Sequence, residues 1–181
     1  MKTTAQQNRN GFTLIEILAV IAIIGILAAI MVPLAGNAKK TAQKRRAQTE
    51  MQSIKVAVVQ FYDDHRYMPW PDNPKVGEDK WASDAATQQP VMDLLTGNNP
   101  KNKVYLQIPE KSRPADKTLV FNDPWGQPYH VGMDRNMDGA VTVQGTQVAD
   151  WDNKTVMEKV LVFSPGLPDE NEPLKTFDVP N

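Results

Sequence analysis

The most informative segment of this chain reads NGFTLIEILAVIAIIGILAAIMVPLAG, at residues 10–36. From Ile17 to Ala35, nineteen consecutive residues carry no polar side chain. About twenty such residues span the hydrocarbon core of a bilayer as a helix, so the run predicts a transmembrane helix. Glu16 stands directly before it. A carboxylate at the centre of a spanning helix costs roughly 2.5–3.5 kcal/mol, so its position needs an explanation.

A cleaved secretory signal is the other interpretation of this segment. Such signals have an apolar core of about 7–15 residues that ends at a small-residue cleavage site. Here the core is longer, the basic region before it holds only Lys2 and Arg9, and no Ala-x-Ala site closes it. We therefore expect a retained helix.

Helical periodicity continues beyond the apolar run, over residues 37–64. Neither Gly nor Pro occurs between Asn37 and Asp64, and apolar residues recur at spacings of 4, 3, 4 and 3. This stripe consists of Ala47, Met51, Ile54, Val58 and Phe61. It predicts an amphipathic continuation of one helix from Phe12 to about Asp64, roughly 80 Å long at 1.5 Å per residue.

Charge is distributed unevenly along the 181 residues. Residues 1–64 carry eight Lys or Arg against four acids, whereas residues 65–181 carry twelve against seventeen. Nucleic-acid binding rests largely on cationic groups, so we expect no nucleic-acid partner for the anionic part. The chain has no cysteine, which excludes disulfides and thiol chemistry.

Residues 65–181 predict a globular head. A Pro-rich loop follows Asp64, and residues 90–99 predict a short helix that Gly97 ends. Short β-prone runs predict strands at residues 104–108, 118–121, 129–133, 140–143 and 159–164. The predicted fold class is α+β, with a long N-terminal helix, membrane-spanning in its first half, packed on a small antiparallel sheet.

Gly11, Phe12 and Glu16, with the apolar run in one register, resemble the leader motif of type IV pilins and type II secretion pseudopilins. The resemblance implies a pilin-like fold and removal of residues 1–11 as a leader. A prepilin peptidase would cut between Gly11 and Phe12 and methylate Phe12. Residues 12–36 would then form the transmembrane helix and the fibre core.

The resemblance also implies a role for Glu16 in assembly. Its carboxylate is expected near the α-amine of Phe12 on a neighbouring subunit, where opposite charges offset each other's desolvation. The alternative is a carboxylate that sits among lipid headgroups, only four residues into the helix.

Location and partners follow from the same resemblance. The peptidase acts on the cytoplasmic side, so the single-pass protein would lie in the inner membrane with its head in the periplasm, and later in an extracytoplasmic fibre. Its implied partners are its own copies, the peptidase, an inner-membrane assembly platform and minor pseudopilins. The basic residues conflict with this orientation, since five follow the apolar run and only two precede it.

The segment FNDPWGQPY, residues 121–129, resembles a turn of major pseudopilins. We therefore interpret the chain as a fibre subunit closest to the major pseudopilin of type II secretion, which helps move folded proteins across the outer membrane. A type IV pilin, serving adhesion, motility or DNA uptake, is the first alternative, although those often close a C-terminal loop with a disulfide. A membrane-anchored binding protein or enzyme that forms no fibre is the second.

Two oxygen-rich segments are candidates for a structural Ca²⁺. Asp134, Asn136 and Asp138 alternate before a glycine, as in the first half of an EF-hand loop, but the twelfth position is Gly145 instead of Glu. By resemblance to major pseudopilins, Ser164, Asp169 and Asp178 form the second candidate, with Pro168 displacing Asp169 by one position.

No enzymatic activity is expected. The sequence contains no phosphate-binding loop, no H-E-x-x-H and no G-x-S-x-G motif. Its two histidines, His65 and His130, are far apart in the sequence.

Overall fold

The computed structural model describes residues 12–72, 77–143, 151, 153–166 and 173–177, and for residues 31–37 it describes the backbone alone. The chain forms two compact units, Met1–Ala42 and Gln43–Asn181. The second unit contains the α+β head. Helix α1 (Leu14–His65) belongs to both units.

The predicted long helix is confirmed within two residues at each end. Helix α1 covers 52 residues and continues through position 33, although Pro33 lacks a backbone N–H. It ends where Arg66 adopts a left-handed conformation with φ 66°. The Arg66 N–H still donates to the carbonyl of Tyr62 at 2.7 Å, which closes the last turn.

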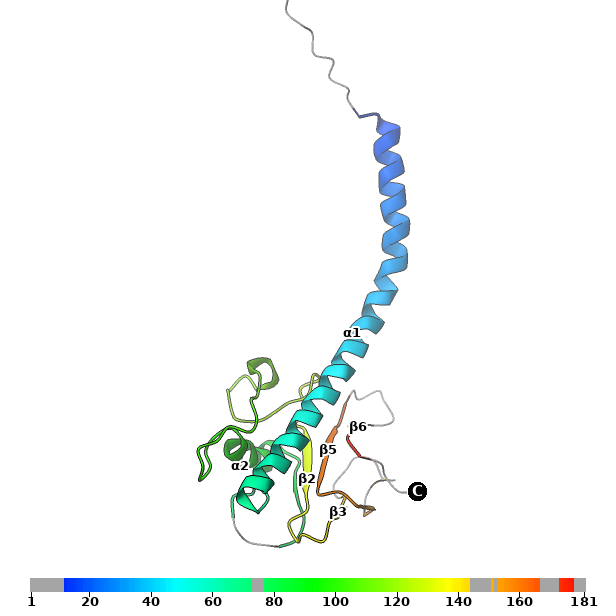
Figure 1. The fold of residues 1–181 in the computed structure, drawn as a ribbon. Coiled ribbons are helices and arrows are strands. Elements are labelled where there is room, and N and C mark those ends of the chain that lie inside the picture. Colours follow the sequence, from blue (N-terminus) through cyan, green and yellow to red (C-terminus); the bar gives the residue numbers. More distant parts are fainter. Residues whose placement is uncertain (1–11, 73–76, 144–150, 152, 167–172, 178–181) are drawn as a thin grey trace, which may run out of the picture. The chain divides into compact units, whose positions relative to one another are not determined.

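The apolar stripe on α1 is the helix side of the head's core. All five predicted residues, from Ala47 to Phe61, are at most 1% exposed. They join a cluster that includes Val131 and Met133 of β2 (His130–Met133), with Val160 and Val162 of β5 (Val160–Ser164). Figure 1 shows this part of α1 alongside both strands.

The main sheet is antiparallel, with strand order β1-β2-β5-β6. Its edge strands are β1 (Lys80–Ala82) and β6 (Leu174–Lys175), and a separate hairpin pairs β3 (Val141–Thr142) with β4 (Thr155–Val156). Strand β5 is buried on both faces, because Val160 and Val162 face the α1 cluster whereas Leu161 and Phe163 join a second one. A strand buried on both faces has a continuous apolar sequence, which is why the strand at residues 159–164 could be predicted.

Two predicted strands are wrong, for one shared reason. The backbone N–H groups of Tyr105 and Leu106 both donate to the carbonyl of Leu95, so residues 104–108 cap the end of a helix and do not join a strand. At residues 118–121, the buried side chain of Gln88 accepts from the Phe121 N–H at 2.6 Å and donates to its carbonyl at 3.3 Å. Other partners therefore replace the sheet ladder in both segments.

The short helix exists but begins earlier than predicted. Helix α2 is Ala85–Leu95, with Asp84 as its N-cap and a reciprocal capping box to Thr87. Pro90, taken as the start in the prediction, lies inside the helix. A 3-10 turn, η1 (Glu110–Ser112), completes the helical elements of the described chain.

Gly132 is required in β2 by a neighbouring indole. Trp81 of β1 pairs with Gly132 across the sheet, and a Cβ on Gly132 would lie 2.5 Å from Trp81 Cζ2. The indole is held there by a hydrogen bond from Trp81 Nε1 to the carbonyl of Thr142, at 2.9 Å. The ring cannot swing aside without breaking that bond.

We expect Gly132→Ala to lower the free energy of unfolding by about 1–3 kcal/mol, because the added methyl group overpacks the Trp81 ring. Urea unfolding followed by tryptophan fluorescence measures this. Gly77→Ala is the matched control, since its Cβ would lie 3.9 Å from its nearest neighbour, and it should change stability by less than about 0.5 kcal/mol. Equal effects of the two substitutions would contradict the clash.

His130 of β2 provides a pH test of the second cluster. Its ring packs 4.5 Å from that of Phe163, and burial lowers its pKa to about 4. The unfolded chain takes up this proton near pH 6.5 and the folded chain only near pH 4. Stability is therefore fully present above pH 6.5 and falls as the pH drops towards 4, by at most about 3 kcal/mol.

We expect His130→Gln to reduce the slope of urea stability against pH between 6.5 and 4. His65→Gln serves as the comparison for the other histidine. A slope that is the same in wild type and His130→Gln would show that other groups cause the acid sensitivity.

Candidate assembly segment

The first half of α1 presents large apolar side chains to solvent. Phe12 is 84% exposed and Ile30 is 59% exposed, and every large apolar residue between them is at least half exposed. These residues are Phe12, Leu14, Ile15, Ile17, Leu18, Val20, Ile21, Ile23, Ile24, Ile26, Leu27 and Ile30. They surround the helix instead of forming one stripe, and a helix that is apolar on all sides is normally buried by something. We call residues 12–30 the assembly segment.

The processing site is described on one side only. Gly11 lies outside the described residues, whereas Phe12 lies two residues before the start of α1 and is exposed. Within the part of the chain that the structure describes, no helix combines the length and the apolarity needed to cross a membrane.

Glu16 has a partner that the sequence interpretation missed. Its Oε2 accepts hydrogen bonds from the backbone N–H and the hydroxyl of Thr13, both at 2.8 Å, and the Glu16 N–H donates to Thr13 Oγ1 at 3.3 Å. This is a capping box, which satisfies donors at the start of a helix. The sequence signal was present, because Thr13 and Glu16 have the T-x-x-E spacing of that motif.

In the first calcium candidate, the carboxylates accept hydrogen bonds from groups of the same loop. Both carboxylate oxygens of Asp134 accept bonds from N–H groups, of Met137 at 2.6 Å and Gly139 at 2.9 Å. The oxygens of Asp138 accept from the Ala140 N–H and from the Asn136 amide, each at 2.9 Å. All four carboxylate oxygens of this candidate therefore already accept hydrogen bonds from groups of the loop.

The second candidate is described only in part. Asp169 and Asp178 lie outside the described residues. Ser164, fully buried, donates its hydroxyl to Asp123 Oδ2 at 2.6 Å, and Asp123 Oδ1 accepts from two N–H groups of the 121–129 turn. Asp123 thus ties this turn to the end of β5. Among the residues that can be described, no three acidic or histidine side chains lie close enough together to hold a metal ion.

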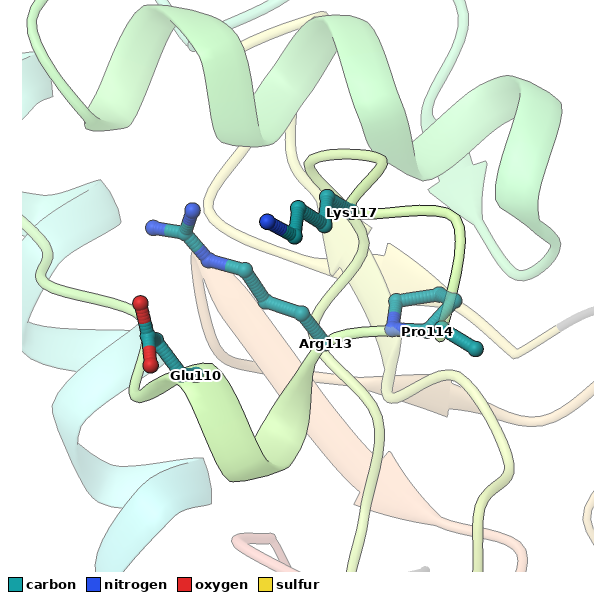
Figure 2. A pocket seen from close by; sticks show the side chains of 5 residues that line it. Glu110, Arg113, Pro114 and Lys117 are labelled. Atoms are coloured by element: carbon teal, nitrogen blue, oxygen red, sulfur yellow. The ribbon is translucent and has the colours of Figure 1, made fainter.

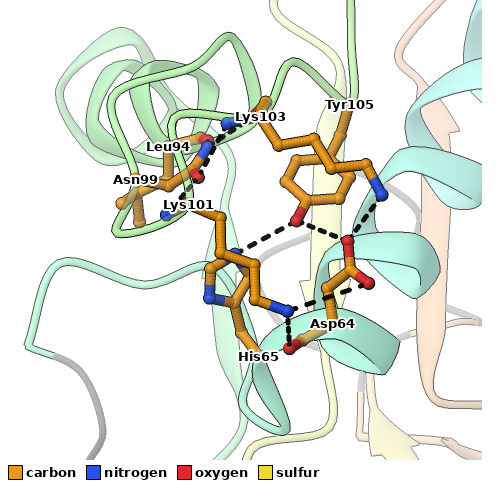
Figure 3. Close-up of polar contacts among 7 residues, drawn as sticks. All are labelled: Asp64, His65, Leu94, Asn99, Lys101, Lys103 and Tyr105. Atoms are coloured by element: carbon orange, nitrogen blue, oxygen red, sulfur yellow. Dashed lines mark hydrogen bonds and ion pairs between the residues drawn. The ribbon is translucent and has the colours of Figure 1, made fainter.

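A polar cluster fixes the end of α1 to the following loops. Lys103 Nζ and the Tyr105 hydroxyl donate to Asp64 Oδ2 at 2.6 and 2.8 Å, and Lys101 Nζ donates to the Asp64 carbonyl at 2.6 Å (Figure 3). The hydrogen bond from Lys103, with that from Tyr105, lowers the pKa of Asp64 to about 2. Two lysines at the helix C-terminus also complement its dipole.

A buried group of polar side chains around Glu50 lies inside the core, where α1 meets η1 and the residue before β2. Glu50 is 8% exposed, and its carboxylate accepts from Arg46 Nε at 2.9 Å, Ser112 Oγ at 3.1 Å and the Tyr129 hydroxyl at 2.7 Å. Burial, with the hydrogen bond to Glu50, raises the pKa of Tyr129. The carboxylate is satisfied from three directions, so it fixes the helix relative to the head.

Known proteins resemble this chain at two levels. Residues 6–32 match the model of the prokaryotic N-terminal methylation motif. Type II secretion system core protein G of Pseudomonas aeruginosa is 32% identical over 128 residues, which cover 68% of this chain and 73% of that protein. The Escherichia coli K12 protein of the same name is 29% identical over 126 residues, or 69% of this chain and 72% of the relative.

A shorter match is to a pilin. Type IV major pilin protein PilE1 of Neisseria gonorrhoeae is 41% identical over 76 residues, which cover 42% of this chain and 35% of the pilin. These designations are those of a secretion core protein and a pilin, and neither denotes an enzyme. No solved structure gives a significant match.

The pilin likeness covers less than half of either protein, whereas the secretion protein of P. aeruginosa matches over two thirds of both chains. This chain therefore belongs to the family of type II secretion system core protein G, and it carries the N-terminal methylation motif.

Proposed function

We propose that this chain is the major structural subunit of a pilus-like fibre that serves type II secretion in the bacterial envelope. The observation that carries the proposal is the exposed apolar surface of the assembly segment, which lies within the methylation motif matched by residues 6–32. Twelve exposed large apolar side chains far exceed what a soluble monomer leaves in one place. Lipid before assembly and neighbouring copies after it would cover them.

The proposal includes a location. Residues 12–36 anchor the chain in the inner membrane, with the N-terminus in the cytoplasm and the head in the periplasm, and the fibre is extracytoplasmic. The nineteen apolar residues from Ile17 to Ala35 support the anchor, since their length suits a bilayer. The prepilin peptidase, an inner-membrane assembly platform and minor pseudopilins are the partners of this pathway.

In this pathway Glu16 receives the α-amine of Phe12 from a neighbouring copy. The carboxylate enters the apolar region already hydrogen-bonded to Thr13, which lowers the cost of its desolvation. The incoming ammonium group then adds an opposite charge where the dielectric constant is low.

Glu16→Ala separates processing from assembly. We expect wild type and variant alike to yield an N-terminal peptide that begins at methylated Phe12, because the cleaved bond is unchanged. We expect the variant to yield at most a tenth as much fibre, since one ion pair per subunit is lost along the whole assembly. Peptide mass spectrometry and the pelleting of sheared fibres measure the two results.

Asp63→Ala, which removes an exposed carboxylate of α1 in the head, is the matched control and should leave the fibre yield unchanged. A wild-type chain that begins at Met1 in native membranes would overturn the processing, and a normal fibre yield from Glu16→Ala would overturn its assembly role.

A type IV pilin is the second candidate, favoured by the 41% identity to the N. gonorrhoeae pilin. Both candidates share the fibre and the processing. They differ in the phenotype of a deletion strain: a secretion subunit leaves exported proteins in the periplasm, whereas a pilin removes surface pili.

We further propose that Ca²⁺ stabilises the head through the C-terminal candidate, Ser164, Asp169 and Asp178. The loop at Asp134 would first have to give up four hydrogen bonds, whereas the residues of the C-terminal segment include three acids within 169–172. Oxygen-rich sites suit this hard cation.

We expect saturating Ca²⁺ to raise the melting temperature by about 2–8 °C, an increase that Asp178→Ala abolishes and Asp138→Ala preserves. Differential scanning calorimetry with and without a chelator measures it. If both variants keep the full response, neither segment is the site.

A further inference from the structure

A surface depression of about 310 Å³ follows η1 in the head. It is lined by Glu110, Arg113, Pro114, Ala115 and Lys117. Two tight backbone bonds shape it: the Arg113 N–H donates to the Glu110 carbonyl at 3.1 Å, and the Lys117 N–H donates to the Pro114 carbonyl at 3.0 Å. Lys117 holds a left-handed conformation, φ 61°, that turns its side chain back to the same side.

Arg113 differs from the paired arginines of the head. Its Nε is buried, and within the described chain no acceptor lies at hydrogen-bonding distance from it. Arg46, in contrast, is bonded to Glu50, and Arg135 is bonded to Asp72 at 2.5 Å. No acceptor of the described head therefore competes with an external anion for this guanidinium.

The charges of the depression favour an anion. Arg113 and Lys117 extend in the same direction, and Glu110 lies on that side as well (Figure 2). Among the described residues, no ion pair within 4.0 Å joins Glu110 to either cation. One positive charge is therefore left in excess, beside a planar guanidinium whose donor geometry matches a carboxylate.

We propose that Arg113 and Lys117 form a binding site for a carboxylate group. The two terminal nitrogens of the guanidinium donate N–H groups to the two oxygens, and Lys117 adds a second positive charge. Glu110 opposes the anion and limits its affinity. The carboxylate comes from an acidic side chain of a second copy or from a free small acid; residues 118–181 of any copy offer ten acids against four bases. The site lies in the head and does not depend on the proposed fibre function.

The probe is acetate, titrated to about 100 mM into the full-length chain in uncharged detergent micelles, a range that covers millimolar affinities. The readout is the Nε–Hε resonance of Arg113 in ¹⁵N spectra. Glu110→Gln and Lys117→Gln are both surface substitutions, so they keep the fold. Lys111→Gln removes an exposed lysine of η1 that does not line the depression, and it is the matched control.

We expect acetate to shift the Arg113 resonance, with affinity about threefold weaker in Lys117→Gln, about threefold tighter in Glu110→Gln and unchanged in Lys111→Gln. The opposite signs distinguish a local site from a general effect of net charge. No shift, or equal effects of Lys111→Gln and Lys117→Gln, would overturn the proposal.

A dilution series without acetate identifies the source of the carboxylate. A concentration-dependent shift of the same resonance that added acetate reverses supports a second copy. A resonance that is independent of protein concentration but responds to acetate supports a free acid. Failure of the fibre proposal would leave both results unchanged, because neither requires processing at Phe12.

Discussion

The burial of a single apolar stripe, Ala47 to Phe61 on α1, is the constraint on which the head depends. A lone amphipathic helix cannot stay folded with that stripe in water, so a sheet has to cover it. Strand β5 meets this demand with Val160 and Val162, while Leu161 and Phe163 build a second cluster behind the sheet. Small strands thus suffice, because the central one is packed on both faces.

Polar groups then fix the position of α1 along its own axis relative to the sheet. Apolar contacts are not directional and would tolerate a shift along the helix axis. The carboxylate of Glu50 does not tolerate one, because its three donors come from α1, from η1 and from Tyr129, the residue before β2. Asp64, at the C-terminal end of α1, is held in a similar way by donors from the loop at residues 101–105. These two carboxylates define the register that the stripe leaves open.

Sequence periodicity predicted the features that depend on one dominant interaction. The helix from residue 14 to 65 and the strands at 130–133 and 160–164 follow from apolar patterns, and the structure confirms them. The strands predicted at 104–108 and 118–121 do not form, because the backbone N–H groups there bond to groups outside the sheet. The acceptors are the carbonyl of Leu95 and the side chain of Gln88. Strands β1, β4 and β6, two or three residues long, are too short to carry a pattern. In the assembly segment, the hydrogen bond of Glu16 to Thr13 was overlooked, although the T-x-x-E spacing was visible in the sequence.

The Thr13 bond changes what an ion pair at Glu16 would contribute to assembly. A bare carboxylate would gain its first hydrogen bonds from the incoming α-amine, and that gain would be large. Here two bonds already exist, so the amine adds charge more than hydrogen bonding. Apolar packing of the residues around α1 can supply most of the affinity between copies. It fixes neither the rotation of one helix about its axis nor its shift along a neighbouring helix. A charge held in one place on the first turn fixes both. In the proposed fibre the carboxylate would therefore set the register of neighbouring helices, in the same way that Glu50 sets the register of α1 within the head.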